Sequence, residues 1–333
     1  MQLKKVGEFG LIDTISRLTA RHNPSVIKGI GDDAAVIRQG VSDCLLVTTD
    51  TLVEDIHFIL CQTTPYLLGK KCVSVNFSDI AAMGGVPRYY TVSLSVPAET
   101  PCGFVTSLYR GMDSQAKRFS AVLLGGDTTG TRGGISVSVT ALGTARTDQV
   151  LYRSGACPGD LICVTGTLGD AALGLEMLAE GSGVSRRNTL VRKHLDPVPR
   201  VAEARAIAGL KAATSMIDIS DGLLADLGHI LDQSRAGARI SLPALPLSGA
   251  YRKRCRAAGR DFFREALCGG EDYELLFTIR PDCRAAVERL VRKHGTSVAC
   301  IGHITGTPSE LVVWDESGKP AMFAETGYSH FQV

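Results

Sequence analysis

Acidic residues recur in this sequence at the ends of apolar runs and beside glycines. Six aspartates share this setting: Asp33, Asp50, Asp79, Asp127, Asp218 and Asp221. Two carboxylates about 4 Å apart repel by roughly 4 kcal/mol at an effective dielectric constant near 20. Several of them at one site therefore need either a cation or raised pKa values. Oxygen ligands without thiolates or paired imidazoles favour Mg²⁺, which usually accompanies phosphate groups.

Each of these residues also has an ordinary interpretation when it is considered alone. Asp218 and Asp221 could equally cap the helix expected to follow them, and capping is compatible with metal binding. His57 would more often be a packed histidine, Glu271 a turn acid and Arg153 a surface cation. Only the combination of residues distinguishes a site from these alternatives.

Three familiar nucleotide or metal motifs are excluded by the residues present. Gly29–Ala34 fits the G-x-G-x-x-A dinucleotide pattern, but two carboxylates stand where a pyrophosphate needs bare N–H groups. Gly69 and Lys70 lack the rest of a phosphate-binding loop. A calcium loop beginning at Asp218 would place His229 where a glutamate is required.

Length and composition indicate an ordinary cytoplasmic enzyme. The 333 residues suffice for two domains, and a net charge of +2 offers no basic field for nucleic acid. No apolar stretch is long enough to span a membrane. The ten cysteines are scattered without C-x-x-C pairs, which predicts buried, reduced thiols.

Helices and strands are expected to alternate, giving an α/β (α+β) fold. The predicted helices are Gly7–Ala20, Tyr66–Met83, Phe104–Phe119, Asp170–Ala179, Pro199–Ala208 and Leu223–Asp232. The predicted strands are Gly29–Ile37, Leu45–Thr49, Tyr90–Val96, Ala121–Leu124, Ile135–Leu142, Leu161–Val164 and Ser215–Ile219. The segments Tyr273–Thr278, Arg284–Lys293 and Val298–Ile304 are expected to continue the α+β mixture. A polar turn region near Thr147–Pro158 divides residues 1–150 from 151–333, predicting two domains that face each other across a cleft.

Eight motifs in series resemble the thiamine-monophosphate kinase family, within the wider aminoimidazole-ribonucleotide synthetase-like superfamily. They are Gly7-Glu8-Phe9, Ile30–Ala34, Thr48–Val53 with His57-Phe58, Asn76–Gly84, Gly125–Thr129, Arg153–Gly155, Ile217–Leu223 and Gly269–Leu275. The resemblance runs from about residue 7 to the end. It implies a two-domain fold whose first sheet pairs with its twin in a homodimer, with ATP between the domains.

The resemblance also implies roles for individual residues. The implied Mg²⁺ ligands are Asp33, Thr48, Thr49, Asp50, Asp79, Asp127, Asp218 and Asp221. The residues expected to touch ATP are Tyr109, Gly126, Asp127, Arg153 and Ser220. Those expected at thiamine monophosphate are His57, Glu271 and Tyr328. Of these, Asp50, Asp127 and Arg153 are the expected catalytic group. One departure is Asp55, which stands where the family commonly has glycine before His57.

The implied reaction is direct transfer of the ATP γ-phosphoryl group to thiamine monophosphate, giving thiamine diphosphate. The acceptor phosphate is largely dianionic near pH 7, so no general base is needed, and none is visible. The alternatives are another ATP-dependent enzyme of the superfamily, or a noncatalytic metal-binding protein.

Overall fold

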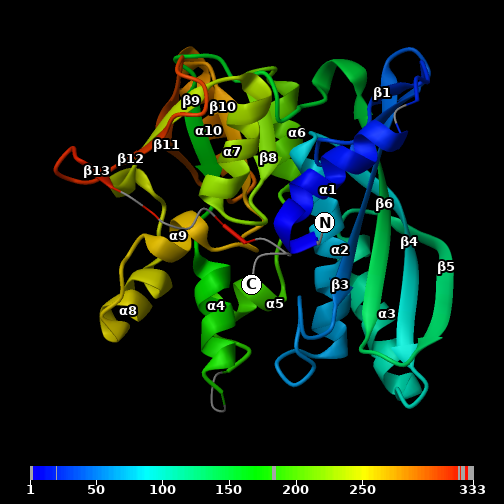
Figure 1. The fold of residues 1–333 in the computed structure, drawn as a ribbon. Helices are drawn as coiled ribbons and strands as arrows, with labels where there is room; N and C mark the ends of the chain where they lie inside the picture. Colours follow the sequence, from blue (N-terminus) through cyan, green and yellow to red (C-terminus); the bar gives the residue numbers. More distant parts are fainter. Residues whose placement is uncertain (1–2, 20, 182–184, 322, 324–326, 329–333) are drawn as a thin grey trace.

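The computed structural model describes residues 3–19, 21–181, 185–321, 323 and 327–328. Two β-sheets lie side by side, and helices cover their faces (Figure 1). The first sheet uses residues 26–146 and the second residues 161–321. A short 3₁₀ turn, η1 (Thr147–Gln149), begins the connection between them.

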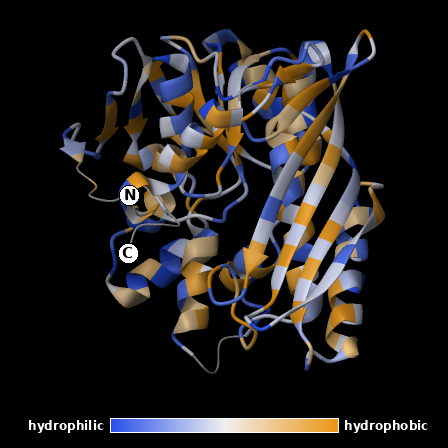
Figure 2. Cartoon of the chain, turned by 45° about the vertical axis from the view of Figure 1, so that its right-hand side comes forward, coloured by the Kyte–Doolittle hydropathy of each residue, from blue (hydrophilic) through white to orange (hydrophobic). Residues whose placement is uncertain are grey.

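The first sheet has six strands in the order β1-β2-β3-β6-β4-β5, and only the β4–β5 pair is parallel. Its strands are β1 (Val26–Lys28), β2 (Ala35–Gln39), β3 (Asp43–Val53), β4 (Val86–Pro97), β5 (Val122–Thr131) and β6 (Ser136–Arg146). Apolar and polar residues alternate along these strands, as the banding in Figure 2 shows. The apolar face packs against the helices α2 (Pro65–Ala82) and α3 (Cys102–Lys117).

Helix α2 lies between the two sheets and is almost entirely buried. It contacts β3 and β6 on one side, and α6 (Val201–Gly209) and β8 (Ala213–Asp218) on the other. Its start follows from the sequence, since the Thr64 hydroxyl accepts a hydrogen bond from Leu67 N and Pro65 holds the first turn. Its end is fixed by Gly84, whose φ of +72° suits glycine. The backbone of α2 is therefore positioned by both domains.

The second sheet has seven strands in the order β13-β12-β9-β11-β7-β10-β8. Besides β8, its strands are β7 (Leu161–Thr165), β9 (Gly237–Ser241), β10 (Leu275–Ile279), β11 (Val298–Thr305), β12 (Leu311–Trp314) and β13 (Pro320–Ala321). One core lies under α6 and α10 (Arg284–Arg292). The other lies under α4 (Asp170–Ala179), α5 (Thr189–Leu195), α7 (Leu223–Ser234), α8 (Gly249–Ala258) and α9 (Arg264–Cys268).

The remaining helix, α1 (Leu3–Thr19), crosses the middle of the view in Figure 1 between the two sheets. It is kinked at Gly7, which has a φ of +71°. Phe9 reaches across to the ring of His229 on α7, with 4.4 Å between the ring centroids. No helix among the described residues has both the length and the apolarity to cross a bilayer.

Most predicted elements are present, but three details were wrong. Asp50 does not end a strand, because β3 continues through it to Val53. Asp33 lies in a bend before β2 and not within a strand. Asp127 lies inside β5, which extends well past the predicted Leu124. The cysteines form no disulfide, yet Cys61, Cys102 and Cys157 are exposed, so the expectation of buried thiols holds for only some of them.

The close approach of α2 and α3 depends on glycine. A Cβ at Gly111 would lie 1.9 Å from Tyr66 O, so the substitution Gly111→Ala must push the helices apart. We expect a loss of roughly 1–3 kcal/mol in the free energy of unfolding, measured by denaturant titration. Gly103→Ala is the matched control, because a Cβ there meets nothing within 4 Å. Equal stability of the two variants would contradict this account of the interface.

Candidate active site

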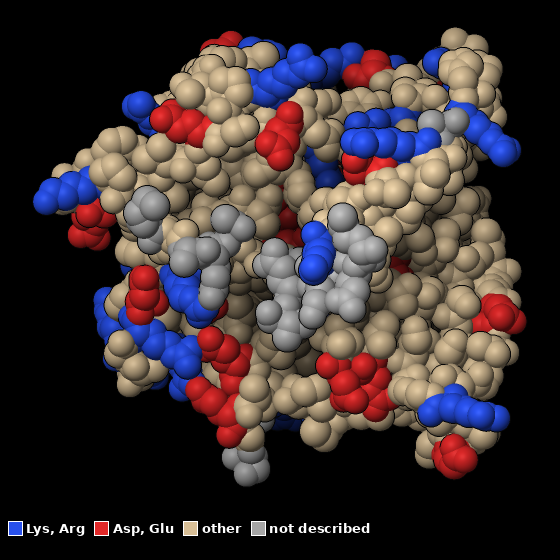
Figure 3. Space-filling view, viewed as in Figure 1, with Lys and Arg blue, Asp and Glu red and all other residues tan. Residues whose placement is uncertain are grey.

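A cavity of about 970 Å³ opens between the two domains. The space-filling view shows this face hollowed near its middle, with acidic atoms visible inside (Figure 3). Most of the predicted site residues border this cavity: Asp33, Thr48, Thr49, Asp50, His57, Asp79, Arg153, Asp218, Ser220, Asp221, Glu271 and Tyr328. The structure therefore brings together residues that lie almost 300 positions apart in the chain.

Asp33 is held by Arg153, which lies on the segment joining the domains. Arg153 Nε and Nη2 lie 3.0 and 2.5 Å from Asp33 Oδ1. Its backbone N–H also donates to Asp32 Oδ1 at 3.2 Å. Burial and the Arg153 charge act in opposite directions on Asp33, and burial dominates, raising its pKa to about 8. Arg153 therefore supplies a cation to the acidic side of the cavity.

Strand β3 and helix α2 present acids to each other across the cavity floor. The Thr48 hydroxyl donates to Asp79 Oδ2 at 2.6 Å, and Asp50 N donates to Asn76 Oδ1 at 3.0 Å. Thr49 points the other way, as strand alternation requires, and its hydroxyl donates to Val139 O. Its side chain is therefore separated from those of Thr48 and Asp50.

The Asp218–Gly222 motif joins the end of β8 to the start of α7. Asp218 accepts a 2.5 Å hydrogen bond from the Ser78 hydroxyl of α2. Asp226, one turn into α7, accepts from the backbone N–H groups of Ser220, Asp221 and Gly222 at 3.1–3.2 Å. The capping role considered for Asp218 and Asp221 thus belongs to Asp226. That leaves their carboxylates to face the cavity.

Crowding raises the pKa values of the acids in this cavity. Burial raises the pKa of Asp50 to about 6, and repulsion from Asp218 and Asp221 adds to the effect. Burial also raises the pKa of Asp79 well above its usual range, with further repulsion from Asp50, Asp218 and Asp33. Burial likewise raises the pKa of Asp218. Carboxylates that repel one another in this way fit a divalent cation, which would remove the repulsion.

In the described residues no three His, Cys, Asp or Glu side chains converge closely enough to hold a metal ion as they stand. The carboxylates instead contact neighbours within the chain: Asp33 contacts Arg153, Asp79 contacts Thr48 and Asp218 contacts Ser78. The donor set consists of carboxylate and hydroxyl oxygens, which Mg²⁺ prefers. Binding of a cation would require these side chains to turn from their present partners.

The residues predicted to contact the substrate also line this cavity. His57 accepts a hydrogen bond from Val53 N through Nδ1, which puts the ring proton on Nε2 when the ring is neutral. Asp55, two residues earlier, has a φ of +63°, a conformation in which a glycine would be expected. Tyr328 N donates to Asp221 O, which places Tyr328 beside the acidic motif.

Tyr109, Gly126 and Asp127 do not border the cavity. Paired residues across the first sheet run from Asp50 through Val139 and Val92 to Gly126. Three strand spacings separate the ends of this row, or about 14 Å. Asp127 lies next to Gly126 on the exposed edge strand β5, and Tyr109 interacts with Thr128 beside it. Within one chain these three residues are therefore remote from the other predicted ligands.

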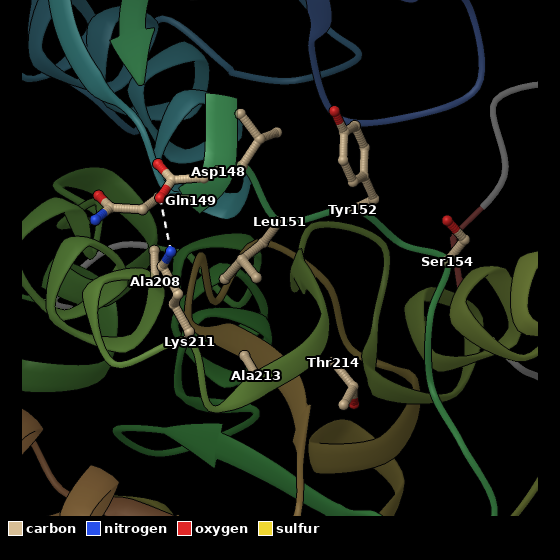
Figure 4. Close-up of a pocket in the computed structure, with 10 residues that line it drawn as sticks. Asp148, Gln149, Leu151, Tyr152, Ser154, Ala208, Lys211, Ala213 and Thr214 are labelled. Carbon is tan, nitrogen blue, oxygen red and sulfur yellow. Dashed lines mark hydrogen bonds and ion pairs between the residues drawn. The ribbon is translucent and has the colours of Figure 1, made fainter. Parts of the chain in front are cut away.

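The residues that border or support the cavity and escaped prediction include Lys71, His194, Asp226 and Tyr273. Asp226 had a usable signal, since an acid in the first turn of a helix commonly caps it. A second pocket, of about 210 Å³, lies at the domain connection, where Lys211 pairs with Asp148 (Figure 4). It contains none of the predicted site residues.

Comparison with known proteins adds independent evidence. The AIR synthase related protein N-terminal domain matches residues 31–145, and the corresponding C-terminal domain matches residues 157–315. The thiamine-monophosphate kinase of Buchnera aphidicola subsp. Acyrthosiphon pisum is 38% identical, with 98% of this chain and 99% of that protein covered. The chain belongs to the thiamine-monophosphate kinase family. The family's Escherichia coli K12 member is likewise 38% identical, with 98% of both chains covered.

The family fold is also confirmed at the level of structure. A solved structure of AaThiL complexed with AMPPCP and TMP superposes with a TM-score of 0.85 at 33% identity, covering 99% of each chain. The two-domain α/β architecture expected from the resemblance is therefore correct.

Crowding at the site can be tested by removing one charge. A raised pKa means that the folded protein binds the Asp79 proton more tightly than the unfolded chain does, so Asp79 destabilises the protein increasingly as the pH rises above about 4. We expect Asp79→Asn, in chelator at pH 8, to raise the melting temperature by roughly 2–4 °C, and by less at pH 5.

The control is Asp113→Asn, which removes an exposed acid paired only with Lys117 on α3. Its melting temperature should stay within about 1 °C of the wild type. A melting temperature of Asp79→Asn below that of the wild type at pH 8 would show that Asp79 stabilises the metal-free protein.

Proposed function

We propose that this protein transfers the γ-phosphoryl group of ATP to thiamine monophosphate, producing thiamine diphosphate and ADP. The observation that carries the proposal is a single cavity that gathers several aspartates and Arg153, which suit phosphates and a divalent cation. The same cavity holds exposed apolar side chains and Glu271, which suit a cationic heteroaromatic ring. Family membership supports the choice of substrates, as does the AaThiL relative with AMPPCP and TMP bound.

The acidic side would hold Mg²⁺ through Asp33, Thr48, Asp50, Asp79, Asp218 and Asp221, as the sequence predicts. Thr49 could contribute only through its backbone, because its side chain faces the other way. When bound, Mg²⁺ would neutralise the charge of the meeting phosphates and of these carboxylates. Support comes from the raised pKa values of Asp33, Asp50, Asp79 and Asp218. Asn76 holds the backbone N–H of Asp50, and Asp226 holds the backbone N–H groups of residues 220–222. These hydrogen bonds fix the backbone that carries the proposed ligands before a cation binds.

Positioning is the main contribution that the chain makes to the reaction. An oxygen of the acceptor phosphate attacks Pγ, the bond from Pγ to the bridging oxygen breaks, and ADP leaves with that electron pair. Arg153 offers a guanidinium to the transferring group, and Ser220 lies beside it on the same cavity wall. The acceptor needs no proton removed at neutral pH, so the lack of a general base is consistent with this chemistry.

The part of the cavity around His57, Glu271 and Tyr328 would receive the thiamine rings. The cavity is also lined by the exposed apolar side chains Phe9, Ile30 and Ile56, which are 49%, 54% and 60% exposed. Such exposed side chains, gathered at one cavity, favour a ligand with apolar faces. The Glu271 carboxylate suits the positive thiazolium ring.

We further propose a homodimer in the cytoplasm, in which each chain lends its β5 edge to the other's cavity. Support comes from the exposed residues of β5, including Val122 at 55% and Leu124 at 58%, next to Gly126 and Asp127. An exposed edge strand of this kind readily pairs with a second copy. Asp127 and Tyr109 would then reach the ATP site of the partner. The free thiols suit a reducing compartment.

The activity is tested by incubating the protein with ATP, Mg²⁺ and thiamine monophosphate and separating thiamine phosphates by chromatography. We expect thiamine diphosphate to form, and Asp50→Asn to lower the rate by at least about 100-fold without lowering the melting temperature. Asp43→Asn, at the exposed start of the same strand, should keep wild-type activity. A folded wild-type protein that forms no thiamine diphosphate would refute the proposed activity.

The shared site is tested by co-expressing Asp50→Asn and Asp127→Asn chains, each inactive alone. A mixed dimer would contain one doubly damaged site and one intact site. Random pairing should therefore restore about a quarter of wild-type activity, since half of the dimers are mixed. Purified mixed dimers without activity would contradict a partner role for Asp127.

A further inference from the structure

Three charged or polar side chains meet at the cavity around Glu271. Lys71 Nζ lies 2.7 Å from Glu271 Oε1, and His194 Nδ1 lies 2.6 Å from Glu271 Oε2. The Lys71 and His194 side chains are 3% and 5% exposed, whereas Glu271 keeps 24%. Glu271 and His194 border the cavity, and Lys71 lies behind them. Each oxygen of the carboxylate thus has one buried partner.

The three residues come from three separate elements in two domains. Lys71 is on α2, His194 is in the last turn of α5, and Glu271 precedes β10. Ser78, seven residues after Lys71, lies two helical turns further along the same face and bonds to Asp218. One face of α2 therefore contacts Glu271 through Lys71 and Asp218 through Ser78.

The backbone around Glu271 is also held by hydrogen bonds. Glu271 N donates to Ser220 O at 2.7 Å, and Tyr273 N donates to Ile219 O at 2.8 Å. Glu271 and Tyr273 have φ values of +67° and +50°, in the left-handed region that residues other than glycine rarely adopt. Such strained conformations persist only where the surrounding contacts enforce them, and they concentrate at functional sites.

The charges in this cluster favour an ionised Glu271. Burial alone would raise its pKa, but Lys71 and His194 together hold the pKa well below its usual range. Burial and the Lys71 ammonium lower the pKa of His194, which favours a neutral imidazole with Nδ1 2.6 Å from Glu271 Oε2. An ionised carboxylate with both oxygens braced and one edge open to the cavity can accept one further partner.

We propose that Lys71 and His194 are positioning residues that fix the Glu271 carboxylate as a preset anionic contact for thiamine monophosphate. This inference rests on the proposed function and adds to it two residues that do not touch the nucleotide. If the cluster were merely structural, its loss would lower stability and weaken the binding of both substrates. If Lys71 and His194 position Glu271, their loss weakens the binding of thiamine monophosphate alone, and only while the Glu271 carboxylate is present.

The experiment compares four single variants of the full chain. Lys71→Met and His194→Leu remove each donor, Glu271→Gln removes the charge, and His194→Asn keeps a donor near the Nδ1 position. Titration calorimetry gives the Kd for thiamine monophosphate and for AMPPCP, and steady-state assays give KM and kcat. Melting temperatures check that each variant folds.

We expect Lys71→Met and His194→Leu to weaken thiamine monophosphate binding roughly tenfold, with His194→Asn within about threefold of wild type. AMPPCP binding should stay within about twofold throughout. In the Glu271→Gln background, adding Lys71→Met should change the Kd by less than about twofold, because its effect passes through the carboxylate. If Lys71→Met does not fold, the two His194 variants decide the question.

Unchanged thiamine monophosphate binding in folded His194→Leu would overturn the inference, as would equal weakening of both ligands. The kinase activity and the positioning role can be refuted by different outcomes. Selective weakening of thiamine monophosphate binding without turnover in the wild type would leave the positioning role standing and refute the kinase activity. A wild type that does not bind thiamine monophosphate refutes both.

Discussion

Burial of several carboxylates in one poorly hydrated cavity is the constraint on which the rest of the structure depends. Burial raises the pKa values of Asp33, Asp50, Asp79 and Asp218, and repulsion between carboxylates adds to the effect at the first three. The chain answers with hydrogen bonds and one guanidinium. These contacts are partial compensation, since the pKa values remain raised. A site left in this state binds cations readily because neutralising it releases unfavourable energy already present in the fold.

Helix α2 connects that constraint to the fold. The helix is buried between the sheets, so packing fixes the backbone that carries Asn76, Ser78 and Asp79 close to the acids they face. The same packing places Lys71 beside Glu271. Polar groups on a helix this buried must find partners. Asn76 and Asp79 find theirs on β3, whereas Ser78, Lys70 and Lys71 find theirs in the second domain, so the polar contacts of α2 also help to fix how the two domains face each other.

Much of this arrangement could be predicted from the sequence, because the signals were local. Thr64-Pro65 marks the start of α2, and the alternation along β3 and β6 marks their buried face. The partners within the site were not predictable, because they depend on approach in space. Arg153 meets Asp33 across 120 residues, and His194 meets Glu271 across 77 by numbering. Likewise, nothing local showed that three strand spacings would separate Asp127 from Asp50.

The left-handed conformation of Asp55 shows how one substitution can change a loop without changing its shape. Aspartate tolerates this region better than most residues do, so the turn before His57 keeps the backbone path that glycine allows. An unfolded chain with aspartate there samples fewer conformations than one with glycine. Ordering this loop on folding therefore costs less entropy, which stabilises the folded turn that carries His57.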